Sequence, residues 1–509
     1  MDTAKPVAAQ TRMNLDSEFC GRVPLNQTNL VQPHGVLLVV ETGSLQVLQC
    51  SENVGGFFGI AADAFAGTSL DSHLAPGGAE RLRERLASGA SGKFPLQLTV
   101  AGAELLFVIE PGTDYFLAEG ERLDKSPGSF VEVYERLRYV MAGIESAAGT
   151  IEACDIIARE LKAYSGFDKV MVYRFDKNWN GEVIAEAKEP GMDAYMGLVF
   201  PASDIPRQAR ELYRKNPYRL IPSVEYDPIK LHPILNPRTH SFTDLSNSNL
   251  RSVAGVHLEY LRNMGVQASM STRILRNGEL WGLIACHHRE PRYLGYEACS
   301  VFEMLSNVIT AKISSVENNA YGARKAEGHQ LLQQVAEAIY NAGGLSVGLD
   351  RECDALLRLL QADGFALVHQ RNVHRWGVTP AASDINDIVY WLQSNGERRL
   401  FAENALSSQY EQGRHYAADA SGLLALPLMP DKGSFLLVFR REAVQNVNWG
   451  GDPSQAVQFE ADGKRYHPRA SFQLWQQTLE HTAPAWTATD EHLAESFRQF
   501  LVDYALRSA

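Results

Sequence analysis

The chain has 509 residues, so one hydrophobic core is excluded, and with roughly 150 residues per domain about three domains are expected. It carries 48 Lys and Arg residues against 60 Asp and Glu residues, a net charge of −12, which argues against a nucleic-acid-binding surface. The longest apolar runs, such as Gly35 to Val40, are far shorter than the roughly 18 residues of a membrane span, and no signal-peptide pattern opens the chain. We therefore expect a cytoplasmic protein without a membrane or nucleic-acid partner.

The six cysteines, at positions 20, 50, 154, 286, 299 and 353, form no CxxC pair and have no zinc-ligand spacing. Most are predicted to be buried, reduced thiols. Cys20 differs because it lies near the N-terminus and could reach a site that its own domain does not form. A lone cysteine is nevertheless more often an ordinary half-exposed thiol.

A small α+β unit is predicted between residues 36 and 109. Two β-rich runs joined by Glu41-Thr42-Gly43-Ser44 predict one hairpin, and a second is predicted around Ala101-Gly102-Ala103. The predicted strands span 36–40, 45–50, 95–100 and 104–109, and the predicted helices span 51–60 and 79–88.

A second domain is predicted after a helical stretch over residues 130–165. Its first strands are expected over 169–175 and 182–188, joined by the turn Asn178-Trp179-Asn180-Gly181. The first of these strands would place Tyr173 on a face of the sheet.

Two prolines, Pro201 and Pro206, fix the backbone on either side of Asp204, and Ile205 is pushed toward extended geometry by the proline that follows it. This predicts a stiff, non-helical corner whose carbonyls have few local N–H partners and suit donors from another group. A helix start is predicted at Arg207. On this stretch alone, a proline-bounded turn before a surface helix is an equally good interpretation.

A proline-rich loop over 217–237 is too long to be passive in a compact domain, so a function is expected for it. A helix over 252–264 follows and contains His257. Further on, Cys286-His287-His288 does not have the spacing that would place metal ligands on one face of a helix or strand.

One long amphipathic helix is predicted over 297–341, interrupted only weakly at Gly322 and Gly328. Its length suggests a spacer or a dimer seam. The third region, roughly 342–509, alternates strands and helices and ends in a helix over 490–506. It contains a polar, turn-rich stretch over 440–475.

The Asp204 corner, His257 within Val256–Gly265, the run Trp281–His288, and Tyr173 within Val172–Phe175 together resemble the chromophore-binding GAF domain of phytochromes, nearly residue for residue. Gln32-Pro33-His34-Gly35 and Pro468-Arg469-Ala470-Ser471-Phe472 extend the resemblance over essentially the full length. The chain resembles the photosensory core of a bacteriophytochrome, a red/far-red light receptor that carries a linear tetrapyrrole.

The resemblance implies an α+β fold of three domains, PAS, GAF and PHY, with antiparallel sheets and a long connecting helix. It implies a figure-of-eight knot, in which the segment near Val31 passes through a lasso formed by the loop 217–237. The implied limits are an N-terminal segment over 1–20, PAS over 21–127, GAF over 128–318 and PHY over 319–509, with a tongue at about 440–475.

The implied cofactor is biliverdin IXα, linked through a thioether to Cys20. Relatives that carry a reduced bilin attach it to a GAF cysteine at the position that is Val256 here. Three departures from the family pattern are the segment Val23–Leu30, Tyr195, where many relatives have Phe, and Ala254, where some relatives have serine. The implied cofactor-binding residues are Asp204, His257, His287, Arg219, Arg251, Ser269, Ser271, Tyr173, Tyr195, Phe200, Ile205, Pro206, Tyr213, Tyr260 and Met264.

Each part of the bilin has implied partners. The backbone carbonyl of Asp204 and the imidazole of His257 would accept from the pyrrole N–H groups and stabilise a cationic pigment. Arginine and serine side chains would bind the propionates, and His287 would bind the carbonyl of ring D. The propionate ligands would be Arg219, Arg251, Ser269 and Ser271, and the ring D slot would be formed by Tyr173, Tyr195, Phe200 and Tyr260.

The tongue would act as a switch. Arg469 needs an anionic partner, and the resemblance implies that this partner is the exposed carboxylate of Asp204. After ring D rotates, the partner of Asp204 would change from Arg469 to Ser471. Pro468, Phe472 and Trp449 complete this predicted switch.

The predicted function is a red/far-red photoreceptor module that signals to an output domain, a histidine kinase or diguanylate cyclase, or to a response regulator. No Walker loop, GGDEF run or kinase ATP-binding motif is found, so the chain is not expected to be an enzyme itself. A homodimer through the long helix is expected. The alternative is a pigment-free GAF/PAS sensor of a small ligand such as a cyclic nucleotide, and the colour of the holoprotein would distinguish the two.

Overall fold

The computed structural model describes residues 25–89, 92–123, 130–369, 372–455, 457–459, 466–468 and 472–508. The chain divides into two compact units, one formed by 1–314 with 448–475 and the other by 315–447 with 476–509. Among the described cysteines, Cys50, Cys154, Cys286 and Cys299 are buried and Cys353 is half-buried, and all are free thiols as predicted. Cys20 lies outside the described residues.

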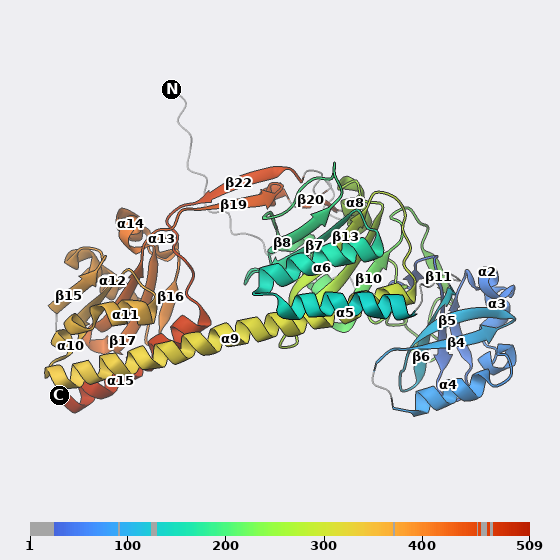
Figure 1. The fold of residues 1–509 in the computed structure, drawn as a ribbon, viewed down its shortest axis with the longest axis horizontal. Coiled ribbons are helices and arrows are strands. Elements are labelled where there is room, and N and C mark those ends of the chain that lie inside the picture. The colour runs from blue at the N-terminus through green and yellow to red at the C-terminus, as the bar shows by residue number, and fades with distance from the viewer. Residues whose placement is uncertain are drawn as a thin grey trace, which may run out of the picture. The chain divides into compact units, whose positions relative to one another are not determined.

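The first sheet of unit 1 has the strand order β1-β11-β3-β2-β6-β5-β4 (Figure 1). Both predicted hairpins are confirmed, because β2 pairs with β3 and β4 with β5, each antiparallel. The predicted helix over 51–60 is shorter, since Ser51 ends β3 and pairs with Leu231 of β11. The elements are β2 (Val36–Glu41), β3 (Val47–Ser51), α2 (Val54–Phe58), α3 (Ala62–Phe65), η2 (Leu70–His73), α4 (Gly78–Ala87), β4 (Phe94–Val100), β5 (Ala103–Glu110) and β6 (Tyr115–Arg122).

The proline-rich stretch 217–237 is not the structureless loop that we predicted, because it contains β10 (Tyr218–Ile221) and β11 (Ile229–His232). Strand β1 (Leu30–Val31) pairs antiparallel with β11. On its other side, Gln32 N–H donates to Leu250 O (2.7 Å) and Ser252 N–H donates to Leu30 O (2.8 Å). The N-terminal strand is thus held on both sides by the segment 229–252. This supports the expected knot, which remains a prediction.

The second sheet of unit 1 has the order β10-β12-β13-β7-β8-β9-β19-β22, and helices α5 and α6 cover one of its faces (Figure 1). The predicted helix over 130–165 is in fact two helices, because the chain breaks at 147–149, where Gly149 is extended and Glu152 accepts from Ala148 N–H. The elements are α5 (Phe130–Ser146), α6 (Thr150–Ser165), β7 (Lys169–Phe175), β8 (Gly181–Lys188), β9 (Val199–Phe200), η3 (Ala202–Asp204), α7 (Arg207–Lys215), α8 (Gly255–Asn263), β12 (Ala268–Arg276) and β13 (Glu279–His288).

Part of the tongue belongs to the same unit. Strand β19 (Gln445–Gly450) joins the second sheet through a parallel bridge between Trp449 and Val199. Further tongue strands are β20 (Val457–Phe459), β21 (Tyr466–Pro468) and β22 (Leu474–Leu479). The bridge ties the tongue to β9, the strand that carries Phe200.

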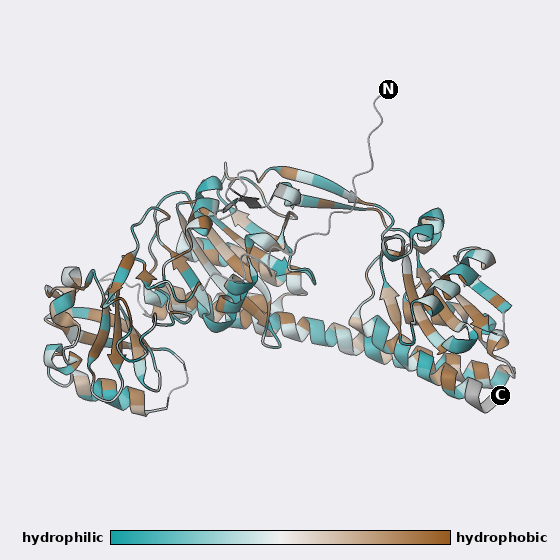
Figure 2. Ribbon diagram, turned by 180° about the vertical axis from the view of Figure 1, so that it is seen from behind, coloured by the Kyte–Doolittle hydropathy of each residue, from teal (hydrophilic) through white to brown (hydrophobic). Residues whose placement is uncertain are grey.

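Unit 2 is built on an antiparallel sheet of order β15-β14-β18-β17-β16. Figure 2 shows apolar residues concentrated along these strands. A buried ion pair, Arg440 Nη2 to Asp490 Oδ2 at 3.0 Å, fixes the start of the last helix. The elements are α10 (Leu345–Arg351), α11 (Cys353–Leu360), β14 (Gly364–His369), β15 (Asn372–Gly377), α12 (Ala382–Ser394), β16 (Phe401–Glu403), α13 (Leu406–Gln409), η4 (Glu411–Tyr416), α14 (Ala417–Ala420), β17 (Gly422–Met429), η5 (Pro430–Lys432), β18 (Ser434–Arg440) and α15 (Ala488–Ser508).

The predicted long helix is confirmed as α9 (Tyr296–Ala342), 47 residues without a break, and its C-terminal part belongs to unit 2. Neither Gly322 nor Gly328 interrupts it. Gly328 faces α15 so closely that a Cβ there would overlap the buried side chain of Leu493, whereas a Cβ at Gly322 would meet nothing within 4 Å. Gly328 therefore permits the close approach of the two helices.

Replacing each of these two glycines with alanine should separate the effect of packing on stability from the effect of helix propensity. Alanine gains about 0.5–1 kcal/mol of propensity at either site, but overpacking costs about 1–3 kcal/mol. We expect Gly322→Ala to raise the free energy of unfolding of unit 2 above that of the parent. Gly328→Ala should have a lower free energy of unfolding than Gly322→Ala. Urea unfolding followed by tryptophan fluorescence measures both variants, and equal stabilities would contradict the close packing at Gly328.

Candidate functional site

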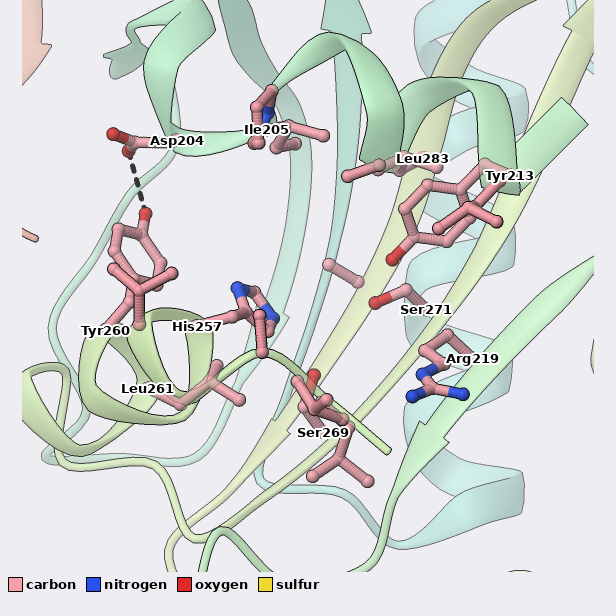
Figure 3. Close-up of a pocket in the computed structure, with 18 of the residues that line it drawn as sticks. Asp204, Ile205, Tyr213, Arg219, His257, Tyr260, Leu261, Ser269, Ser271 and Leu283 are labelled. Carbon is pink, nitrogen blue, oxygen red and sulfur yellow. Dashed lines mark hydrogen bonds between the residues drawn. The ribbon is translucent and has the colours of Figure 1, made fainter. Parts of the chain in front are cut away.

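A cavity of about 380 Å³ opens in unit 1 beside α7 and α8, and its lining comes from the Asp204 corner, both helices and strands β10, β12 and β13 (Figure 3). The structure brings together all the predicted cofactor-binding residues except Tyr195. Residues that we missed include Leu261, Leu283 and Ala285. The period-2 alternation of β13, which puts Leu283, Ala285 and His287 on one face, was the signal that could have found two of them.

The Asp204 corner comprises residues 201–206. It is not non-helical as predicted, because Ala202–Asp204 form one 3₁₀ turn in which Asp204 N–H donates to Pro201 O (3.0 Å). Ile205 then leaves the helical region but is not fully extended (φ −128°, ψ 80°), and Pro206 precedes the first residue of α7. Helix α7 thus begins at Arg207, as predicted, and the proline-bounded geometry carries Ser203 to Pro206 into the cavity wall.

The Asp204 carboxylate is only partly exposed and accepts a hydrogen bond from the Tyr260 hydroxyl (2.8 Å, Figure 3). This corrects our description of it as exposed. Tyr260 and His257 lie three residues apart on α8, and their rings stack at 5.9 Å with an interplanar angle of 11°. Helix α8 is shorter than predicted because Ser252 instead pairs with Leu30. The carboxylate, the phenol and the imidazole therefore form one connected group.

Two histidines of the cavity are held neutral. Removal from water, reinforced by the positive charge of Arg219, lowers the pKa of His257 to about 4. Removal from water lowers the pKa of His287 to about 3, with smaller contributions from Lys169 and His257. At neutral pH both imidazoles can therefore accept a hydrogen bond at one nitrogen and donate at the other.

These pKa values predict an acid-sensitive apoprotein. Between about pH 6.5 and 4 the unfolded chain binds protons at these histidines and the native chain does not, so stability should fall with falling pH. Each histidine contributes at most about 1.4 kcal/mol per pH unit. Denaturant unfolding across this range measures the free energy of unfolding, which should depend less steeply on pH in His257→Gln than in the parent. An unchanged slope in His257→Gln would contradict the assignment.

A cationic wall is formed by Arg219 on β10 and by Arg251. Arg219 Nη1 donates to Asn249 O (3.0 Å) and Nη2 to Arg251 O; Arg251 Nη1 donates to Leu25 O (3.1 Å). Arg251 is only 8% exposed, and its Nε has no hydrogen-bond partner. Burial, with the charge of Arg219, lowers the pKa of Arg251 to about 9. No carboxylate of the described residues pairs with either guanidinium, so this wall suits an anionic ligand.

Hydroxyl groups lie next to the cationic wall. In the β10–β12 ladder, Ser271 is opposite Arg219 and Ser269 is opposite Ile221. Figure 3 shows Tyr213, Ser271, Ser269 and Arg219 on one side of His257, with Asp204 and Tyr260 on the other. Burial raises the pKa of Tyr213, and its hydrogen bond with Ser271 opposes this effect. The two sides of the cavity therefore differ in character. The side with Arg219 is cationic and rich in hydroxyl groups, and the other side carries the Asp204 carboxylate.

Aromatic side chains line the end of the cavity that lies near the Asp204 corner. Tyr173 and Phe200 line the cavity and meet edge to face at 5.6 Å. Tyr195 does not line it, because it packs behind Phe200 at 5.5 Å and under Lys169 Nζ, which lies 3.6 Å from its ring. The prediction of Tyr195 as a wall residue is therefore wrong, since its ring is occupied by the cation.

The tongue reaches the same site. Pro468 lines the cavity, and the Phe472 ring meets Tyr260 edge to face at 5.1 Å. A Cβ on Gly450 would lie 2.8 Å from Phe200 Cζ, so the backbone beside Trp449 lies directly on that ring. His467 Nδ1 contacts Glu259 Oε1 at 2.9 Å. Arg469 and Ser471 lie outside the described residues, so their exchange at Asp204 remains a prediction.

The run Cys286-His287-His288 is split among three surroundings. Cys286 packs in the hydrophobic core, His287 lines the cavity, and His288 Nδ1 lies 3.0 Å from Asp168 Oδ2. Among the described residues, no three His, Cys, Asp or Glu side chains are grouped as a metal site would require. Nor does any helix in the part of the chain that the structure describes have the length and apolar character needed to cross a membrane.

Three family models match the chain: the PAS fold over residues 20–105, the GAF domain over 150–313 and the phytochrome region over 328–509. Cyanobacterial phytochrome B of Nostoc sp. is 34% identical over 502 residues, covering 97% of this chain and 67% of the relative. A bacteriophytochrome of Xanthomonas campestris is 32% identical over 95% of this chain and 78% of its own length. The chain thus spans about two thirds of the length of the cyanobacterial relative.

Solved structures agree with these matches. The bacteriophytochrome RpBphP3 of R. palustris has a TM-score of 0.84 at 33% identity, covering 96% of this chain and 99% of that one. The phytochrome photosensory core module of Stigmatella aurantiaca has a TM-score of 0.84 at 34% identity, covering 96% and 98%. The chain belongs to the phytochrome family of red/far-red photoreceptors and comprises its PAS–GAF–PHY photosensory module.

Proposed function

We propose that the cavity binds biliverdin IXα, a linear tetrapyrrole with two propionates, as the pigment of a red/far-red receptor. The observation that carries the proposal is the pair Arg219 and Arg251, which lines an apolar cavity without a carboxylate partner among the described residues and leaves Arg251 Nε unsatisfied. The two propionates of one ligand would satisfy both guanidinium groups with charge-assisted hydrogen bonds. A volume of about 380 Å³ lies within the range of small-molecule sites.

The remaining residues supply what such a ligand needs. Ser269 and Ser271 add hydroxyl donors beside the arginines, and the neutral imidazole of His257 with the backbone carbonyl of Asp204 accepts from the pyrrole N–H groups. His287 binds the carbonyl of the terminal ring, and Tyr173, Phe200 and Tyr260 enclose that ring. The pigment, when bound, absorbs light and isomerises at this ring, and the protein controls its proton and the space around it.

Attachment is proposed at Cys20. Leu25, the first described residue, lines the cavity, and the five Cα-to-Cα steps from Cys20 to Leu25 can span about 17 Å, so the thiol can reach the pigment. The position used by relatives with a reduced bilin is Val256, which lines the cavity and has no thiol.

An absorption spectrum tests the function. The protein produced with biliverdin should be coloured, and its spectrum after dark incubation should differ from that after red illumination. A colourless protein that instead binds a cyclic nucleotide would reject the proposal in favour of a small-ligand sensor.

The connected group of Asp204, Tyr260 and His257 is expected to control the proton of the pigment. Asp204→Ala and His257→Ala should leave pigment binding largely intact but stall photoconversion, because a proton relay loses its acceptor or donor. Flash-induced absorbance changes measure this, with Asp227→Ala, at an exposed aspartate, as the control. Normal photoconversion in both variants would remove these residues from the mechanism.

The signal is proposed to leave through the tongue. Phe472 packs on Tyr260, so repacking of Tyr260 around a rotated ring reaches the tongue directly. An exchange of the Asp204 partner from Arg469 to Ser471 would change the balance between a hairpin and a helical tongue by about 1–3 kcal/mol. Hydrogen exchange over 440–475 should then differ between dark and light, and the same exchange in both states would reject this route.

A homodimer with an output domain beyond the module is proposed to receive the signal. The 47-residue helix α9 supports it, because a helix of this length suits a spacer or dimer seam. Sedimentation of the holoprotein in dark and light measures the assembly, and a monomer in both states would reject the dimer.

A further inference from the structure

One cation of the site has no part in the proposed binding of the pigment. Arg210 on α7 is 6% exposed and lies against the Asp204 corner. Its Nη1 donates to Ile205 O (2.6 Å) and to Ala202 O (3.4 Å). One guanidinium therefore holds two carbonyls, one from each side of Asp204 along the chain.

The turn between β7 and β8 supports this guanidinium from its other side. Arg210 Cζ lies 4.7 Å from the centre of the Trp179 ring, a cation–π contact. Trp179 has φ +66°, which is rare for a bulky residue, so the backbone is held in an unfavourable conformation that presents the indole to Arg210.

The same turn contacts the corner directly. Ala202 N–H donates to Asn180 Oδ1 (3.3 Å). Asn180 is itself fixed by Asp176, whose Oδ1 accepts from the backbone N–H groups of Asn178 (2.7 Å) and Asn180 (2.9 Å) and whose Oδ2 accepts from Asn180 Nδ2 (2.9 Å). The corner is thus attached to the β7–β8 turn directly through Asn180 and indirectly through Arg210 and Trp179, and is not held only by its two prolines.

We propose that Arg210, stacked on Trp179, is a positioning residue that fixes the direction of the Asp204 backbone carbonyl and so raises the proton affinity of the bound tetrapyrrole. The inference rests on the proposed function, in which that carbonyl accepts from the pyrrole N–H groups. Hydrogen bonds weaken steeply with misalignment, so a loosened corner stabilises the cationic pigment less.

Charge and geometry can be separated by choice of variant. Removing the guanidinium altogether would also remove a positive charge near the pigment, with the opposite effect on its proton affinity. Arg210→Lys keeps the charge, but an ammonium has no planar guanidinium to stack on the indole, so the donor to the two carbonyls loses its fixed direction. Trp179→Leu keeps the guanidinium and loses only its support. Arg214→Lys, at an exposed arginine on the same helix, is the matched control.

The experiment titrates the red absorbance of the biliverdin-loaded full chain with pH. We expect Arg210→Lys to lower the pKa of the bound pigment by about one unit, a tenfold change, and Trp179→Leu to lower it in the same direction by less. Arg214→Lys should titrate like the parent. Thermal unfolding of each variant is recorded in parallel, because a purely structural role would reduce stability and pigment yield without moving the pKa of the pigment that binds.

An unchanged pigment pKa in Arg210→Lys and Trp179→Leu overturns the proposal. If Arg210→Lys does not fold or bind pigment, the pigment pKa of Trp179→Leu alone tests the proposal. Trp179 is partly exposed, so its replacement should disturb the fold less. A colourless parent chain, by contrast, is a failure of the proposed function and is distinguishable from both outcomes.

Discussion

Replacing Cys20 with serine should abolish all pigment that survives denaturation. A thiolate can add to a vinyl group of the bilin to form a thioether, whereas a serine hydroxyl is too weak a nucleophile at neutral pH. Val256 offers no alternative thiol in the cavity wall, and the described cysteines of unit 1 are all buried. The bilin should still enter the cavity, because the arginines that hold it are unchanged. Denaturing electrophoresis with detection of the pigment measures covalent attachment.

Cys353→Ser is the matched control for this experiment. Cys353 is the half-buried described thiol of unit 2, so its loss should leave covalent pigment at the parent level. A covalent bilin persisting in Cys20→Ser would place the attachment at another cysteine and reject the assignment.

Local signals were sufficient wherever neighbouring residues determine the structure. Strand β7 begins at Lys169 and ends at Phe175, as predicted, because its apolar run is bounded by turn residues. Pro201 and Pro206 placed the corner and the start of α7 correctly, since proline restricts the backbone wherever it stands. The most specific site residues could be named because several family motifs occur together along the chain, in the order that the family has. No single motif would have justified naming them.

Non-local contacts account for the predictions that failed. Strand β11 forms only because β1 and β3, distant in sequence, offer unpaired edges to it. Tyr195 does not line the cavity and instead contacts Lys169 of β7, and a cation–π contact between a strand and a distant loop residue has no local sequence signal. The bond from Tyr260 to Asp204 joins residues 56 positions apart. In each case the deciding partner is set by the assembled fold.

The second large effect is expected at Arg251, where pigment affinity and apoprotein stability should change in opposite directions. In the empty cavity its charge is costly, because it is buried beside Arg219 and its Nε has no partner. Arg251→Met should therefore stabilise the apoprotein, and thermal unfolding should show a higher midpoint. Arg219→Met is less suitable, since it removes two bonds to carbonyls, those of Asn249 and Arg251, whereas Arg251→Met removes only the one to Leu25 O.

The same variant should bind biliverdin about 10- to 150-fold more weakly, which corresponds to the loss of about 1.5–3 kcal/mol for a hydrogen bond between charged groups. Absorbance titration in the Cys20→Ser background measures this affinity at equilibrium. Arg262→Met, at an arginine of α8 that pairs with Glu225 at 2.6 Å on the surface, should match the parent.

Esterified pigment identifies the group that Arg251 recognises. Biliverdin dimethyl ester lacks both propionate charges, so the parent should bind it at least as weakly as Arg251→Met binds the acid. Arg251→Met itself should discriminate much less between acid and ester than the parent does, because one partner of the interaction is already gone. If Arg251→Met preferred the acid as strongly as the parent does, the propionates would not be bound by this arginine. The stabilisation of the apoprotein would then reflect only the removal of a buried charge.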